Sequence, residues 1–580
     1  MVVMNFLWVI VAGLLSGWAF VFWFLKRVNE WYYVGRVGEM VYSLPPGDLG
    51  WPFLGNMLPL INSLRSGNPN AFIYNLVSRF GKTGIYKTHL FGCPSIIVCT
   101  PELCRRVLTN DETFGLGYPK SANILAGRKS LHNTSNIEHR RLRRIIANPI
   151  NGHQALAMYI KHIEDVVINY LDEFASMNKP FELFTEMKML TFKVVISIFM
   201  GSVSDSTFRA THKLYNDYHQ GLLSMAIDIP GFAFHKALKD EHIVNLILIS
   251  FSAGFESSAM GALWAIVHLS EHPEALKKAK EEQQEIMKRR PSTQKGLSLT
   301  DIKRMEYLAK AIDEMLRKTN ILSLFREAKA DVSINGYTLP KGWKVLAWTG
   351  AVHMDPETYE DPQHFNPSRW DNIKTKAAAF IPFGAGSRSC PGSDLGKLII
   401  SIFLHYFLLN YELKRVNPKS PLRYSQGPMT DDNCLAEVIK IPNPSVFLSS
   451  PTLKEITAAD TAIVATSSGS SKEKSSKKKE ILKAFLKSLD DSSDEDGEED
   501  SEVLKLLLIP NGNGLGILVM ALMIIFLDLK ICNIIIAMSS TTAIAHTADT
   551  AALLFTIKDA TSEDIIVVFT IKDCCSTFHY

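Results

Sequence analysis

The stretch that decides the fold is Phe383-Gly384-Ala385-Gly386-Ser387-Arg388-Ser389-Cys390-Pro391-Gly392, followed at once by the apolar run Leu395 to Leu409. The glycines allow a tight backbone turn. The arginine is a forked donor for a carboxylate. The helix predicted after the turn directs its N–H groups at the Cys390 sulfur, which favours a thiolate, and a thiolate on iron promotes O–O cleavage. The stretch indicates a haem site, with a buried structural cysteine as the alternative.

The same stretch resembles the haem-binding signature of cytochromes P450, Phe-x-x-Gly-x-Arg-x-Cys-x-Gly, at every fixed position. The resemblance implies haem b as the cofactor and Cys390 as the axial ligand of its iron. The other residues expected to contact the haem from this loop are Phe383, Gly384, Arg388 and Gly392.

Glu314 and Arg317 are three residues apart on a predicted helix, so they share a face and can pair. Taken alone, such a pair is better explained by a solvated helix surface. Upstream of the cysteine, however, the pair resembles the Glu-x-x-Arg motif of cytochromes P450, which a Pro-x-Arg segment completes through Arg369. The resemblance implies that these three charges form an interior network that supports the cysteine loop.

A long apolar helix is predicted from Val244 to Leu269, and it contains Ala253-Gly254-Phe255-Glu256-Ser257-Ser258. A glycine inside a helix costs about 1 kcal/mol relative to alanine, and a carboxylate in an apolar stretch is costly to bury. A helix facing a wet cleft is one explanation. The segment also resembles the oxygen-activation motif of cytochromes P450. That resemblance implies an oxygen groove at Ala253 and Gly254 and proton delivery by Glu256 and Ser257, where the family usually has threonine.

His139 and Arg143 lie in Glu138-His139-Arg140-Arg141-Leu142-Arg143-Arg144. Their spacing resembles that of the helix in cytochromes P450 that binds the haem propionates, so both are expected to contact the cofactor. A basic, solvated helix face is the alternative, and a basic surface here also suits an acidic electron donor.

The N-terminal residues 1–25 carry no charge before Lys26, which is long enough for a single membrane-spanning helix. Lys26, Arg27 and Arg36 follow and favour a cytosolic position for the rest of the chain. A cleaved signal peptide is the alternative. We expect an endoplasmic-reticulum anchor, followed over residues 26–52 by a linker with the proline-rich hinge Leu44 to Pro52.

The body of the chain reads as mainly α-helical with small β-sheets, which is the cytochrome P450 fold. Residues 53–446 are expected to form the haem domain. Its predicted helices include residues 69–80, 101–108, 154–175, 186–200 and 276–289, and its predicted strands include residues 83–87, 95–99, 331–334 and 338–339. With a net charge of +3 the chain gives no indication of a nucleic-acid partner, and its eight cysteines show no zinc spacing.

Two departures from the family pattern stand out. Several tens of residues are absent after Asp240, where the family carries a helix over the substrate pocket. Beyond the haem domain, residues 447–502 form a charged, Ser-rich linker, and residues 503–580 form an extension for which the sequence indicates no function. We expect this C-terminal part to be disordered.

Longer stretches, such as Gly84 to Gly92 and Ile334 to Tyr337, resemble the plant family of ent-kaurenoic acid oxidases and β-amyrin 11-oxidases. The resemblance implies a haem-thiolate monooxygenase of the ent-kaurenoic acid oxidase type, acting in gibberellin biosynthesis, with β-amyrin 11-oxidation as the alternative. It also implies O₂, an apolar di- or triterpenoid substrate, and electrons from NADPH through cytochrome P450 reductase. A non-catalytic, truncated P450-like membrane protein is the alternative of another class.

Overall fold

The structure is a computed structural model that describes residues 16–17, 23–24, 27–38, 42–52, 54–119, 139–141, 143–144, 150–199, 201, 204, 206–213, 242–319, 323–372, 379–424, 427–442, 542–547, 550–558 and 564–570. The chain forms two compact units, residues 1–534 and 535–580, and each is described by itself. The expected membrane anchor falls almost wholly outside the described residues. Among the described residues, no helix combines the length and the apolar character needed to span a bilayer.

The first unit is mainly helical. Its helices are α2 (Met57–Arg65), α3 (Ala71–Phe80), α4 (Pro101–Thr109), α7 (His153–Ser176), α8 (Leu183–Phe199), α11 (His242–Glu271), α12 (Pro273–Arg289), α13 (Leu299–Lys303), α14 (Glu306–Thr319), α15 (Thr349–His353), α16 (Arg369–Asn372) and α17 (Ser393–Asn410), with a π-helical turn η1 (Glu30–Val34) and a 3-10 turn η2 (Gly386–Arg388). The helices expected near residues 69–80, 101–108, 154–175, 186–200, 244–269 and 276–289 are all present, with ends shifted by up to three residues.

Local capping explains where some of these helices begin. At α4, the Thr100 hydroxyl accepts a hydrogen bond from the Leu103 N–H at 3.4 Å, and Pro101 occupies the first turn, where no N–H is needed. At α13, Ser298 and Asp301 form a reciprocal capping box. These signals are local in the chain, which is why helix positions follow closely from the sequence.

The largest sheet has the strand order β1-β2-β8-β5-β3. The strands of this first unit are β1 (Ile85–Leu90), β2 (Cys93–Val98), β3 (Phe114–Leu116), β4 (Phe181–Glu182), β5 (Ser323–Ala328), β6 (Val332–Ile334), β7 (Tyr337–Leu339), β8 (Lys344–Trp348), β9 (Tyr411–Arg415), β10 (Leu422–Tyr424), β11 (Pro428–Thr430) and β12 (Leu435–Lys440). The first strand begins at Ile85 and runs to Leu90, later than the expected residues 83–87, because the buried residues of this hairpin start there.

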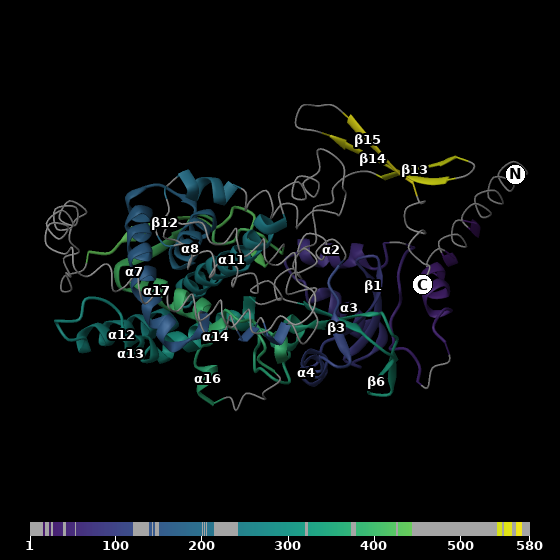
Figure 1. Cartoon of the computed structure of the whole chain (residues 1–580), viewed down its shortest axis with the longest axis horizontal. Coiled ribbons are helices and arrows are strands. Elements are labelled where there is room, and N and C mark those ends of the chain that lie inside the picture. The colour runs from purple at the N-terminus through teal and green to yellow at the C-terminus, as the bar shows by residue number, and fades with distance from the viewer. Residues whose placement is uncertain are drawn as a thin grey trace, which may run out of the picture. The chain divides into compact units, whose positions relative to one another are not determined.

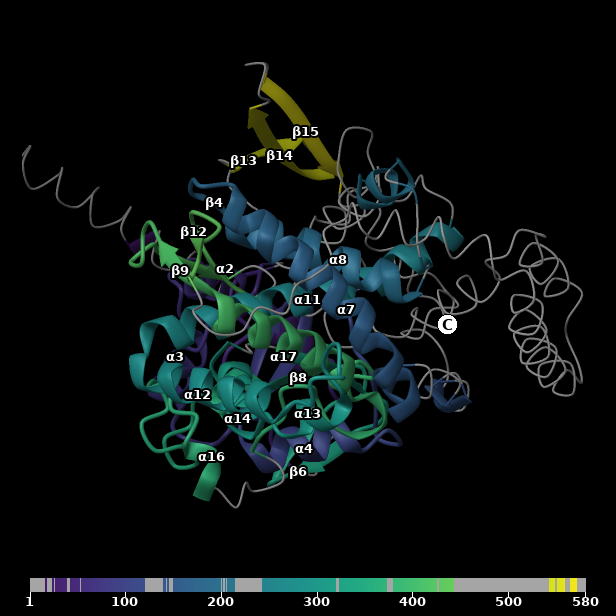
Figure 2. The ribbon, with the colours of Figure 1, turned by 90° about the vertical axis from the view of Figure 1, so that its left-hand side faces the viewer.

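Smaller sheets complete the unit: β4-β12-β9, β10-β11 and β6-β7. In Figure 1 the helices α7, α8, α11 and α17 group together, and the sheet strands β1 and β3 lie near α2, α3 and α4. Figure 2 also shows α11 with α7, α8 and α17 close to it. The apolar core runs through both groups, with Phe255, Leu263 and Ile402 almost fully buried.

The second unit contains an antiparallel sheet, β13 (Thr542–Thr547), β14 (Thr550–Lys558) and β15 (Asp564–Thr570). These residues belong to the extension that we expect to be disordered; the structure has strands here, and the rest of the extension lies outside the described residues. β14 and β15 carry β-branched and aromatic residues with few charges, a composition that favours strands. The charged linker at residues 447–502 lies outside the described residues.

Candidate functional site

The loop Phe383–Gly392, called here the ligand loop, closes on itself through backbone hydrogen bonds. The N–H of Cys390 donates to the Phe383 carbonyl at 2.8 Å. Gly384 and Gly386 have φ values of +73° and +76°, which favour glycine, and a Cβ at Gly386 would lie 2.5 Å from the Leu108 carbonyl oxygen of α4. Gly392 caps α17. The tight turn therefore places half-buried Cys390 directly before a helix N-terminus.

Helix α11 crosses α17 at close range. A Cβ at Gly261 would lie 2.7 Å from the Ile400 side chain, and a Cβ at Gly396 would lie 3.9 Å from the Ser258 hydroxyl. Gly396 is only six residues after Cys390. The crossing therefore brings the segment with the predicted oxygen motif to the helix that follows Cys390, the predicted ligand.

Within α11, the side chain of Glu256 is buried. The Gly254 carbonyl accepts hydrogen bonds from the Ser257 hydroxyl at 3.5 Å and from the Ser258 hydroxyl at 2.7 Å. These bonds occupy a carbonyl that already lies in the helix and can bend it locally. Ala253 lies in α11, but its side chain is outside the description.

Of the two residues predicted to bind the haem propionates, Arg143 lies beside the ligand loop and His139 lies in the interior. The Arg143 guanidinium donates to the Ser389 carbonyl and, at 3.1 Å, to the Ser389 hydroxyl. His139 is buried, and Arg388 is buried in η2. Arg143 therefore contacts the ligand loop directly, one residue before Cys390.

Glu314 joins both predicted arginines in a buried network. Arg317 donates two hydrogen bonds to its carboxylate, at 2.9 and 2.8 Å, and Arg369 donates one at 3.2 Å. Glu314 also accepts from the Asn366 N–H and the Trp370 indole. Burial by itself raises the pKa of Glu314, but the bonds and charge of Arg317 outweigh it, so the pKa lies below its usual value.

This network reaches the ligand loop through His353. Arg317 donates to the His353 carbonyl at 2.8 Å, and the His353 Nε2 accepts the Ile381 N–H at 3.1 Å. Ile381 lies two residues before the loop. Burial, followed by the nearby Arg317 charge, lowers the pKa of His353 to about 3, so the imidazole is neutral and can accept this bond.

The sequence motifs do not single out three residues that the structure buries or connects to the glutamate network: Arg326, His353 and Trp370. Arg326 lies in β5 between Phe325 and Glu327, and its side chain is buried. An arginine in a strand next to Leu324 and Phe325 is a signal that could have been used, because a buried cation needs a partner. No comparable signal marks His353, whose partners lie 28 or more residues away in the chain.

The residues present fit a haem. Cys390 supplies a sulfur donor and is half-buried, so a ligand can reach the sulfur. The loop turns at Gly384 and Gly386, which have positive φ and carry no Cβ. Basic groups suited to propionate carboxylates come from Arg388 in the loop, Arg143 beside it and His139 in the interior. The expected contacts of Arg388, Phe383 and Gly384 with the haem stay predictions.

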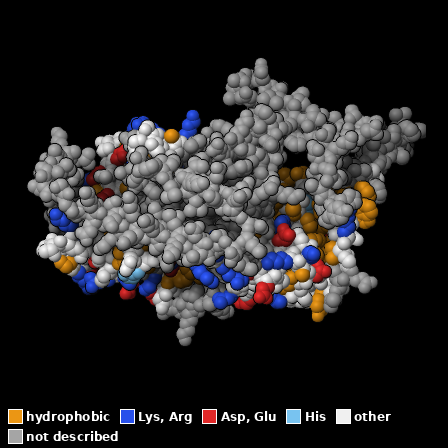
Figure 3. All heavy atoms as spheres, viewed as in Figure 1, with side chains coloured by type: hydrophobic (Ala, Val, Ile, Leu, Met, Phe, Trp, Pro, Cys, Tyr) orange, Lys and Arg blue, Asp and Glu red, His pale blue; other side chains and the backbone are white. Residues whose placement is uncertain are grey.

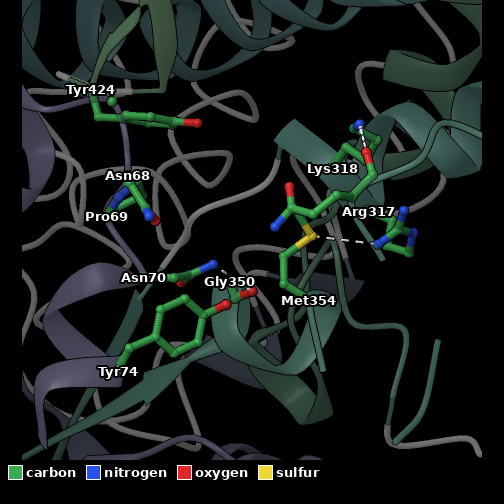
Figure 4. Close-up of a pocket in the computed structure, with 11 residues that line it drawn as sticks. Asn68, Pro69, Asn70, Tyr74, Arg317, Lys318, Gly350, Met354 and Tyr424 are labelled. Carbon is green, nitrogen blue, oxygen red and sulfur yellow. Dashed lines mark hydrogen bonds between the residues drawn. The ribbon is translucent and has the colours of Figure 1, made fainter. Parts of the chain in front are cut away.

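A polar cavity of about 260 Å³ lies beside the glutamate network (Figure 4). Asn68, Tyr74 and Tyr424 line it with polar groups, and the Lys318 ammonium on another wall donates to the Gln363 carbonyl. This lining does not suit an apolar ligand. We therefore do not assign the cavity to a terpenoid.

Curated relatives match most of the haem domain. The chain is 50% identical over 485 residues to 7,8-epoxymelianol synthase CYP88A154 of Ailanthus altissima, covering 75% of this chain and 98% of the relative. It is 47% identical over 468 residues to beta-amyrin 11-oxidase of Glycyrrhiza uralensis, and 46% identical over 465 residues to ent-kaurenoic acid oxidase 1 of Arabidopsis thaliana, each covering 72% of this chain and 95% of the relative. The expected resemblance to this plant family is confirmed.

The first alignment is longer than the part of the chain that it covers. Three quarters of 580 residues is about 435, against 485 aligned positions, so about 50 positions of the relative have no residue here. The match of the chain to its protein family is also split in two, near residues 228–234. Residues 214–241 lie outside the described residues, and the expected absence of a segment near residue 240 stays a prediction.

The solved structure of retinoic acid bound cyanobacterial CYP120A1 has a TM-score of 0.61 at 24% identity, covering 69% of this chain and all of that chain. This likeness confirms a mainly helical fold with small sheets. The family description "Cytochrome P450" matches residues 45–234 and 228–430. With the cysteine loop, the buried glutamate network and the helix that crosses α17, these matches show that the chain belongs to the cytochrome P450 family and is a monooxygenase of that family.

Proposed function

We propose that this cytochrome P450 oxidises an unactivated carbon of a rigid, apolar triterpenoid. The observation that carries the proposal is the crossing of α11 over α17, which brings Ser258 to Gly396 and so the predicted oxygen motif to the cysteine helix. The relatives with 46–50% identity over about 75% of the chain are named for melianol-type and related products, which are triterpenoids.

A bound haem, held by Cys390, would supply O₂ activation and the transfer of one oxygen atom to carbon. The chain's own residues would hold it and move protons. Arg388, Arg143 and His139 would bind its propionates. Glu256 and Ser257 would deliver protons from the interior face of α11.

Ent-kaurenoic acid is the second substrate candidate. The family resemblance stated in the sequence analysis places it before β-amyrin, and the chain is 46% identical to an ent-kaurenoic acid oxidase of Arabidopsis thaliana. The slightly higher identities to triterpenoid enzymes support the opposite order. Gibberellin biosynthesis is the pathway expected only if ent-kaurenoic acid is the substrate.

Electrons would come from NADPH through cytochrome P450 reductase, with the protein held at the endoplasmic-reticulum membrane by residues 1–25 and its catalytic domain in the cytosol. The described residues nearest to that anchor support a membrane-facing side. Trp31 is 80% exposed, and Leu58 of α2 is 52% exposed. Figure 3 shows hydrophobic side chains at its right-hand side, over α2 and the N-terminal helical segment. Exposed aromatic residues of this kind are typical of the membrane interface.

A non-catalytic, P450-like membrane protein is the candidate of another class. It is favoured by the roughly 50 aligned positions of the first relative that have no residue here. Such a protein would take up haem without turning over a substrate.

Microsomes that contain the full chain and a plant reductase would separate these functions. The proposal expects a carbon monoxide difference spectrum typical of thiolate ligation and NADPH-dependent oxidation of a melianol-type triterpenoid. Ent-kaurenoic acid and β-amyrin serve as competing substrates, and Cys390→Ala as the control without a thiolate. Thiolate ligation without turnover of any of the three substrates would support the non-catalytic alternative, and absence of haem uptake would overturn the proposal.

A further inference from the structure

Three side chains from the N-terminal half of the chain bind the residues that surround Cys390. Their targets alternate along the ligand loop at positions 387, 389 and 391. The three interactions are Ser387 hydroxyl to Asp111 carboxylate, Arg143 guanidinium to Ser389 carbonyl and hydroxyl, and Asn151 amide to Pro391 carbonyl. The segment with the thiol is therefore held on both sides by residues about 240–276 positions away in the sequence.

Asp111 is itself held in place. It follows α4, whose residues Leu108 and Thr109 lie so close to Gly386 that any Cβ there would clash. The Lys329 ammonium, from the segment after β5, donates to the Asp111 carbonyl at 2.6 Å. The carboxylate that accepts the Ser387 hydroxyl thus stands on backbone fixed by both α4 and the sheet.

Asn151 has one described partner, the Pro391 carbonyl. Among the described residues, its side-chain oxygen is buried without a hydrogen bond. Pro391 has no N–H and is buried, so its carbonyl needs a donor from elsewhere. Asn151 stands two residues before α7, which packs against α17. The amide therefore connects two packed helices at the residue after Cys390.

We infer that Asp111 and Asn151 are positioning residues for the ligand thiolate, acting through Ser387 and Pro391. Neither side chain is expected to touch haem or substrate. Each holds one end of the short segment Ser387–Pro391, so the sulfur keeps one position and direction. The inference rests on the proposed haem–thiolate function, and it adds residues that the haem-binding signature does not contain.

Loss of either bond should raise the population in which the sulfur has left its ligating position. A net hydrogen bond contributes about 0.5–1.5 kcal/mol, so the ratio of displaced to ligated protein should rise roughly two- to tenfold. The carbon monoxide difference spectrum measures this ratio, because thiolate ligation has its own band position. Asp111→Ala and Asn151→Asp are the test variants; the second keeps the size of the side chain and removes the amide donor.

Two further variants separate positioning from general stability. Asp111→Asn keeps an oxygen that can accept the Ser387 hydroxyl, so it should restore the ratio. In a double-mutant cycle, Ser387→Ala and Asp111→Ala should be non-additive, since both remove one bond. Thr185→Ala is the matched control, because it removes the same type of bond, hydroxyl to the Glu182 carboxylate at 2.9 Å, on α8.

Amide hydrogen exchange on haem-free protein gives a second readout that does not depend on the cofactor. The Cys390 N–H, bonded to the Phe383 carbonyl, should exchange about two- to tenfold faster in Asp111→Ala and Asn151→Asp, and unchanged in Thr185→Ala. Unchanged exchange and spectra in both test variants would overturn the inference. If exchange is faster in the variants but the chain takes up no haem, the proposed function fails, and with it the role of the two residues in positioning a thiolate. The two contacts themselves would still be demonstrated.

Discussion

The Nε2 of His353 accepts the backbone N–H of Ile381 at 3.1 Å, and the two residues connect the buried glutamate network to the ligand loop. The same histidine offers its carbonyl to Arg317 at 2.8 Å. Since Nε2 is the acceptor, the proton of the neutral ring lies on Nδ1. Support for the cysteine therefore passes from Glu314 through Arg317 and His353 to the residue that precedes Phe383 by two positions.

The effect of replacing His353 should depend on whether the new side chain can still accept the hydrogen bond from the Ile381 N–H. His353→Leu leaves the Ile381 N–H buried without a partner, at a cost of about 1–3 kcal/mol. His353→Gln keeps an acceptor oxygen and should lose less. Denaturant unfolding, with haem retention measured in parallel, checks the order; equal losses in the two variants would contradict the role of this bond.

Removing the Glu314 carboxylate should be among the most damaging single changes. Glu314→Ala leaves Arg317 charged in a site where both side chains are 0% exposed, and breaking such a pair costs about 3–5 kcal/mol. Unfolding free energies from denaturant titration give the number. Glu285→Ala, which removes an exposed partner of Arg289, is the control and should change stability by about 0.5 kcal/mol or less.

Gly386→Ala tests the close approach of α4. Its φ of +76° costs an alanine about 1–2 kcal/mol, and the added Cβ also meets the Leu108 carbonyl. Gly342→Ala is matched, because φ is +79° and nothing lies within 4 Å of the new Cβ. Thermal unfolding should show a clearly larger loss for Gly386→Ala. Similar losses would mean that the contact with α4 yields easily.

The predicted role of Ser257 in proton delivery can be tested against its neighbour Ser258, which serves as the control. Ser257→Ala should reduce the share of NADPH that ends in oxidised product by roughly tenfold or more, as expected when a proton-transfer group is lost. Ser258→Ala, which removes the 2.7 Å bond to the Gly254 carbonyl, should affect coupling much less. Ser257→Thr should raise coupling, since its methyl group restrains the hydroxyl. Equal effects of both alanine variants on product per NADPH would argue against the assigned role.

Stability should fall as the pH is lowered from about 6.5 toward 4. Burial lowers the pKa of His89 to about 4 and of His268, His353 and His405 to about 3. Between the unfolded value near 6.5 and these values, the unfolded chain binds protons that the folded chain does not, so folding loses free energy. The contribution is fully present above pH 6.5.

Thermal unfolding at a series of pH values measures this slope. His405→Gln should flatten it, because one buried histidine no longer titrates. His153→Gln, at an exposed position at the start of α7, is the control. A slope that is the same in wild type and His405→Gln would contradict the assignment.

Several features were predictable because their causes are local. The helix over residues 101–109 follows from its cap and its proline, and the Glu314–Arg317 pair follows from a spacing of three on one helix. The predicted site residues on the ligand loop are contiguous, so their proximity needed no fold. The family comparisons confirm the class of fold that these motifs indicate.

What the sequence by itself determined is the turn that presents Cys390, the predicted ligand, because covalent neighbours and glycine φ angles define it. Only the tertiary structure decided which further distant groups hold that turn: His353 on Ile381, Asp111 on Ser387 and Asn151 on Pro391. These partners are 28 to 276 residues apart, and no spacing rule connects them. They meet because burial of apolar surface packs α4 against η2 and α7 against α17, which begins at the end of the loop.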